Sequence, residues 1–143
     1  WDSGNTGANT AGENNPTSPE ESVVVKGKAA KLQSTWIGFI GIGAFASASM
    51  FTGNFVDIDG TNGILSFGQP FTAKPTKLTG YYKYTPVNID YMEQWDSKVD
   101  PDLKSGDSDQ GIIYIALCTK NYEIRTNPKS RQLFDPNDAS VIA

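Results

Sequence analysis

Strict alternation of side-chain character over residues 77–84 is the feature that most constrains the fold of this chain. The residues on one side of an extended backbone are Leu78, Gly80, Tyr82 and Tyr84, and those on the other are Lys77, Thr79, Tyr81 and Lys83. This period of two, with its tyrosines and threonine, predicts a β-strand with two different faces. Pro70, Pro75 and Pro86 bracket it, because proline cannot donate to a sheet ladder. We expect one face in a core and the other, with Tyr81 and Lys83, facing a polyhydroxylated ligand.

The rest of the chain also has a pattern of short strands. We expect strands over residues 22–34 (bent at Gly27), 36–42, 63–67, 110–119 and 122–126. Residues 110–119 are apolar on both faces, which predicts a central strand with Tyr114 near Tyr81 and Lys83. With 14 glycines and 8 prolines to make turns, the sequence predicts an all-β sandwich.

An uncharged stretch at residues 36–55 invites comparison with a transmembrane segment. A spanning helix needs about 20 strongly apolar residues, and this stretch is diluted by glycine, serine and threonine. Glycine inside a strand marks a bulge or a close backbone approach. We therefore expect two strands, or a strand and a loop, and no transmembrane segment.

Size and charge exclude several classes of function. The 143 residues fit a single domain, residues 1–143. The net charge of −4 argues against a nucleic-acid partner, which needs a basic footprint. The chain has no histidine, so the commonest general base and transition-metal ligand is missing. Cys118 is the single cysteine, which excludes an internal disulfide and is typical of a small buried side chain.

Residues 1–21 form a lead-in rich in Asn, Gly, Ser and Thr, and their composition predicts a loop. It either packs only through Trp1 or forms a binding loop in which Trp1, Asp2 and Asn5 supply an aromatic ring, a carboxylate and an amide. The chain opens without a methionine or a signal-type segment, so we expect a mature or partial chain. It ends on the apolar residues Val141, Ile142 and Ala143, and this pattern predicts a strand that continues beyond the given sequence.

Two polar segments are candidate sites in their own right. Residues 57–63 offer Asp57 and Asp59 as weak Ca²⁺ ligands, but Gly60 comes too early for a calcium loop. A hairpin turn accounts for every residue there. Residues 91–109 form a long polar excursion, and Trp95 within it either closes over a ligand or fastens the loop to the domain.

The available chemistry favours binding over catalysis. A glycosidase needs two carboxylates at a defined separation, and Glu93 and Glu123 are isolated in the sequence. Carbohydrate binding needs aromatic rings for the C–H face of a sugar and polar groups for its hydroxyls. The residues that would supply these groups are Trp1, Asp2, Asn5, Tyr81, Lys83, Trp95 and Tyr114. The alternative is that the tyrosines pack and that Lys83 extends its ammonium group into water.

Four segments carry a family resemblance: WDSGNTGAN, VVVKGKAAKLQS, SMFTGNF and FGQPFTAKPTKLTGYYKYTP. In this order they resemble the putative carbohydrate metabolism domain of gut Bacteroidetes lipoproteins, from Trp1 to about Ala143. The resemblance implies a jelly-roll β-sandwich, incomplete at its C-terminus because family members are usually longer. It also implies non-catalytic glycan binding by a cell-surface or periplasmic lipoprotein, with an oligo- or polysaccharide as the partner. We expect no cofactor, with Ca²⁺ at Asp57 and Asp59 as the alternative. The alternatives are a glycosidase-like enzyme and an assembly domain completed by strands of a protein partner.

Overall fold

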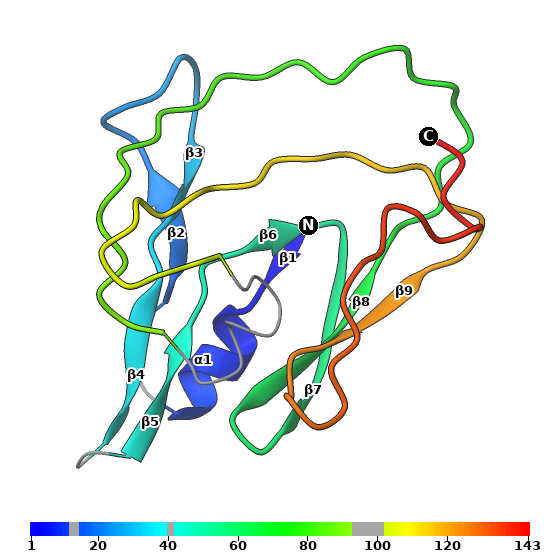
Figure 1. Cartoon of the computed structure of the whole chain (residues 1–143). Helices are drawn as coiled ribbons and strands as arrows, with labels where there is room; N and C mark the ends of the chain where they lie inside the picture. Colours follow the sequence, from blue (N-terminus) through cyan, green and yellow to red (C-terminus); the bar gives the residue numbers. More distant parts are fainter. Residues whose placement is uncertain (12–14, 40–41, 93–101) are drawn as a thin grey trace. The chain divides into compact units, whose positions relative to one another are not determined.

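The computed structural model describes residues 1–11, 15–39, 42–92 and 102–143 (Figure 1). The chain falls into two units. The first unit comprises Trp1–Ala73 and Ala116–Ala143, and the second is Lys74–Ile115. The elements, all in the first unit, are β1 (Asp2–Ser3), α1 (Asn5–Ala11), β2 (Thr17–Glu20), β3 (Ala29–Leu32), β4 (Thr35–Phe39), β5 (Ile42–Ala46), β6 (Met50–Phe51), β7 (Gly53–Asp59), β8 (Asn62–Phe67) and β9 (Tyr122–Arg125). The predicted all-β class is confirmed, whereas the jelly-roll topology stays a prediction.

In the described part of the chain, the strands form four small antiparallel sheets. Three are pairs, β1–β6, β2–β3 and β4–β5, and the fourth has the order β7–β8–β9. The β4–β5 hairpin arises from the glycine-spaced apolar stretch, so the prediction of two strands there is confirmed. Among the described residues, none forms a helix long and apolar enough to cross a membrane.

The β7–β8 hairpin confirms the turn predicted at residues 57–63. Asp59 pairs with Asn62, so Gly60 and Thr61 make a two-residue turn. Gly60 has a φ of 67°, the left-handed conformation that such turns require. β9 then pairs with β8, which confirms the strand predicted at residues 122–126.

A small core lies on this three-stranded sheet and its neighbours. Its buried apolar residues are Ala8, Ile37, Phe51, Tyr122 and Ile124. The Phe51 ring packs on Phe67 with centroids 4.6 Å apart. Tyr122 meets Phe134 edge-on at 5.0 Å. The core therefore joins segments from both ends of the chain.

The N-terminal lead-in differs from the loop expected from its composition. It contains β1, α1 and β2. Ala8 of α1 is buried, and Gly7 lies so close to the Phe55 ring that a Cβ there would be 2.9 Å from Cε2. Tertiary packing of small residues, rather than local propensity, orders this polar segment.

Two of the predicted strands are wrong. Residues 77–84 and most of 110–119 run as extended chain outside any described ladder, apart from a bridge between Cys118 and Val141. Residues 110–119 are therefore not a central strand, and Ile112 is 82 % exposed. Alternation of side chains describes an extended backbone, but only a hydrogen-bonded neighbour turns it into a strand.

A short ladder organises the second unit. Asn88 bridges Ser108 in antiparallel orientation. The Ile89 N–H donates to the Asp107 carbonyl at 2.8 Å, and the Asp109 N–H donates to the Val87 carbonyl at 2.9 Å. These bonds close the base of the polar excursion that the sequence predicts at residues 91–109.

Candidate functional site

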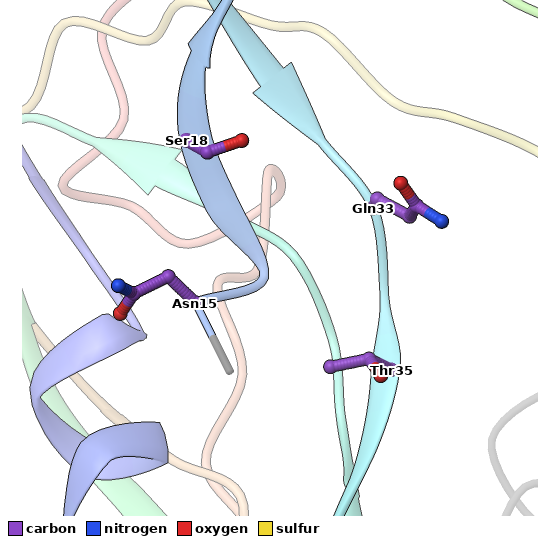
Figure 2. Close-up of a pocket in the computed structure, with 4 residues that line it drawn as sticks. All are labelled: Asn15, Ser18, Gln33 and Thr35. Atoms are coloured by element: carbon purple, nitrogen blue, oxygen red, sulfur yellow. The ribbon is translucent and has the colours of Figure 1, made fainter. Parts of the chain in front are cut away.

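A polar pocket of about 200 Å³ lies in the first unit, beside the β2–β3 pair. Its lining residues are Asn15, Ser18, Gln33 and Thr35. Asn15 precedes β2 and Ser18 lies within it, whereas Gln33 follows β3 and Thr35 begins β4 (Figure 2). In this view Ser18 points toward the segment that carries Gln33, whereas the Asn15 side chain points toward α1 and the Gln33 side chain points away from the space between the two segments.

Backbone pairing fixes the two walls of the pocket. Ser18 pairs with Lys31, and Thr17 pairs with Leu32. The ladder continues one step beyond the named strands, because the Gln33 N–H donates to the Pro16 carbonyl at 2.8 Å. The chain then leaves the ladder, which opens the space between the two segments.

Asn5 of α1 holds the first wall in place. Its Nδ2 donates to the Thr17 carbonyl at 2.6 Å, and its Oδ1 accepts the Thr17 N–H at 3.0 Å. The Thr17 hydroxyl in turn donates to the Ser49 carbonyl at 2.8 Å. The amide of Asn5, predicted as a sugar ligand, is thus hydrogen-bonded to the backbone of β2. It holds in place the strand that forms one wall of the pocket.

Asp2, a second predicted sugar ligand, is also engaged. Its Oδ2 accepts the Phe55 N–H at 2.6 Å, and its Oδ1 accepts the Ser3 N–H at 2.7 Å. These two bonds, first the one from Phe55, lower the pKa of the Asp2 carboxyl below its ordinary value. The carboxylate therefore fastens β1 to β7.

The aromatic candidates lie in different parts of the chain. Trp1 belongs to the first unit and is 82 % exposed. Tyr81, Lys83 and Tyr114 belong to the second unit, where Tyr81 is 86 % exposed. Trp95 lies outside the described residues. The binding role of these side chains stays a prediction.

The weak calcium candidates sit on the β7–β8 hairpin. The Asp59 Oδ2 accepts the Asn127 Nδ2–H at 2.7 Å, and the Asp57 Oδ1 accepts the Ile58 N–H at 2.8 Å. No cluster of three or more His, Cys, Asp or Glu residues suited to a metal ion occurs in the described part of the chain. The two carboxylates have structural partners in the turn and its neighbourhood.

Tyr84 and Asp109 form a contact at the base of the second unit. Desolvation, and then a hydrogen bond to the Asp109 carboxylate, raise the pKa of the Tyr84 hydroxyl. The Asp109 Oδ1 also accepts the Val87 N–H at 2.8 Å. Tyr84 is therefore held beside the 87–89 ladder rather than free in solvent.

The pocket offers neutral hydrogen-bonding groups and no carboxylate. The hydroxyl of Ser18 faces the space between the two segments, and the amides of Asn15 and Gln33 lie at its rim; groups of both kinds donate and accept hydrogen bonds, which suits a ligand with many hydroxyl groups. Sequence reasoning missed all four residues. They are ordinary loop and strand-end residues, and only the pairing of residues 16–20 with 29–33 brings them together.

Comparison with known proteins gives one family. The family model described as the putative carbohydrate metabolism domain matches residues 1–141. No curated protein and no solved structure matches the chain. The family match thus covers both units and all four residues of the pocket.

Proposed function

Because this chain belongs to the putative carbohydrate metabolism domain family, we propose that it binds glycans without cleaving them, through the pocket beside β2 and β3. The observation that carries this proposal is that all four residues lining that pocket have neutral, polar side chains. Sugar hydroxyls pair well with amides and hydroxyls, which can each donate and accept. The cleavage of a glycosidic bond needs two carboxyl groups, and the lining supplies none.

The proposal also has a cellular setting. The resemblance described above points to a surface or periplasmic lipoprotein of a glycan-utilising bacterium, in which such a domain would capture an oligo- or polysaccharide. The acidic chain, with a net charge of −4, favours neutral over anionic glycans, because like charges repel. Its preferred ligands are therefore neutral oligosaccharides.

A glycan array with neutral and acidic sugars tests the proposal. We expect selective binding of neutral glycans by the chain. Gln33→Ala should weaken that binding by about three- to tenfold, the effect of one or two lost hydrogen bonds. Gln69→Ala, a matched change at an exposed residue outside the pocket, should leave it unchanged. Absence of binding to any glycan, or equal effects of the two variants, would refute the proposal.

A second candidate function is assembly with another protein chain. The observation that favours it is the extended, uncharged segment 111–115, in which Ile112 and Ile113 are 82 % and 72 % exposed. Extended segments that lie outside a sheet ladder recruit strands from other chains. Size-exclusion chromatography with light scattering at rising concentration tests it: self-association lost on Ile113→Lys supports assembly through this segment, and a monomer at all concentrations argues against self-assembly.

A further inference from the structure

The ladder of the second unit fixes how the chain on either side of it would align. Asn88 and Ser108 face each other in antiparallel orientation. Two backbone hydrogen bonds lie on either side of this pair. The Ile89 N–H donates to the Asp107 carbonyl, and the Asp109 N–H donates to the Val87 carbonyl. Asn88–Ser108 is therefore a pair without hydrogen bonds of its own, and such pairs alternate with hydrogen-bonded pairs along a ladder.

Two arms leave this ladder on the same side, residues 81–85 and residues 111–115. Within the described residues neither arm belongs to a ladder. The arms are still adjacent where they start, because a Cβ on Gly111 would lie 3.5 Å from Cε2 of Tyr84. Further out they are exposed, with Tyr82 at 80 % and Ile112 at 82 %. Tyrosine and isoleucine are residues that favour paired strands.

Pro86 is the one residue that could forbid continuation of the ladder. In the register of Asn88 and Ser108, Pro86 falls opposite Gln110. This position is again a pair without hydrogen bonds, where the backbone N–H points away from the partner. Proline therefore removes no ladder bond there, and the register passes through it.

We propose that the two arms close into an antiparallel ribbon in this register. Continuing from Asn88–Ser108, the facing residues are Tyr84 with Ile112, Lys83 with Ile113, Tyr82 with Tyr114 and Tyr81 with Ile115. Cross-strand pairs of aromatic and β-branched residues stabilise such a ribbon. Closure pairs exposed apolar side chains with one another and satisfies backbone groups of both arms.

Closure builds an aromatic platform. Because facing residues share a face and successive residues alternate, closure moves Tyr84 away from its contact with Asp109 and brings Tyr82, Tyr84 and Tyr114 together on one face. Tyr81 and Lys83 fall on the opposite face. Three neighbouring phenol rings suit the apolar C–H face of a pyranose, so the platform takes a sugar ring; this step rests on the proposed function. A two-stranded ribbon is marginal alone, and a ligand that binds only the closed form shifts the equilibrium toward it.

Disulfide trapping tests the ribbon independently of any ligand. In a Cys118→Ser background, Tyr82→Cys with Tyr114→Cys should form an intramolecular disulfide on mild oxidation, because facing residues place their Cβ atoms within bonding range. The register-shifted pair, Tyr82→Cys with Ile113→Cys, should form at least about tenfold less, because its side chains lie on opposite faces. Equal yields, or only intermolecular disulfides, would overturn the ribbon.

A second experiment tests the platform. With a glycan that the array identifies, Tyr82→Ala should weaken binding by about tenfold. Tyr81→Ala, a matched change on the opposite face, should have no effect. If binding survives both changes equally, the platform is wrong while glycan binding stands. If no glycan binds at all, the platform falls with the proposed function, and the disulfide experiment still decides the ribbon.

Discussion

Asn5 and Thr17 are joined through both ends of one side-chain amide, across 12 residues of chain. The amide donates to the Thr17 carbonyl and accepts the Thr17 N–H, as a neighbouring strand would. This pairing ties α1 to β2 and so places Ser18 in the wall of the pocket. A residue predicted as a ligand of sugar thus serves as a support for the site.

Removal of this support should cost stability. We expect Asn5→Ala to lower the free energy of unfolding by about 1–3 kcal/mol, because it leaves a backbone donor and acceptor unpaired. Asn9→Ala, at an exposed position on the same helix, is the matched control and should change stability little. Urea denaturation measures both, and equal effects would show that the Asn5 amide carries no such role.

Acid should weaken the attachment of β1 to β7. The N–H groups of Phe55 and Ser3 lower the pKa of Asp2 below its ordinary 3.8. A group whose pKa is lowered by folding contributes its stability above the unfolded-state pKa and loses it as the pH falls toward the folded value. Asp2→Asn should therefore lower the Tm at about pH 6, and this effect should shrink progressively as the pH falls below the ordinary pKa of 3.8 toward the lower pKa of the folded state.

Asp90→Asn controls for the loss of one exposed negative charge. A difference between Asp2→Asn and the unmodified protein that stays constant from neutral to acid pH would contradict the role given to the carboxylate. Thermal unfolding followed by circular dichroism is sufficient for this comparison.

Gly53 should tolerate no side chain. Its φ is 139°, and a Cβ would lie 1.9 Å from the Ser66 carbonyl oxygen on the paired strand. Because the obstacle is backbone, Gly53→Ala should destabilise the protein by more than about 3 kcal/mol or prevent folding. Gly80→Ala places its Cβ in open space and should cost little. Similar unfolding curves for the two variants would disprove this account of β7 and β8.

Ile124 should be a main contributor to the core. It is 5 % exposed, whereas Ile142 is 67 % exposed. Ile124→Ala should cost about 2–5 kcal/mol, because it removes buried methylenes and leaves a cavity. Ile142→Ala makes the same chemical change at the surface and should cost less than about 1 kcal/mol. Chemical denaturation would contradict the placement of the core if the order were reversed.

The parts of the fold that sequence predicted are those with local causes. The β7–β8 turn depends on residues 59–62 alone, where Asp, Gly, Thr and Asn favour a tight turn. The two strands of the apolar stretch could be predicted because glycines interrupt that stretch and because the strands follow each other directly in the sequence. Ile124 alternates with Glu123 and Arg125, so its inward position was readable.

The parts that sequence did not predict depend on distant partners. Residues 77–84 have the pattern of a strand, but the pattern does not say whether a neighbour pairs with them. The composition of α1 is that of a loop, and its order comes from contacts with Phe55 and Thr17. The pocket depends on Pro16 meeting Gln33, which no local motif signals.

The most direct test of glycan binding at this pocket is an NMR titration of the isotope-labelled chain with the strongest ligand from the array. We predict saturable shifts of the backbone amides of Ser18, Gln33 and Thr35 and of the side-chain amides of Asn15 and Gln33. Saturable binding that leaves these five signals unmoved, or no binding at millimolar sugar, would contradict the account.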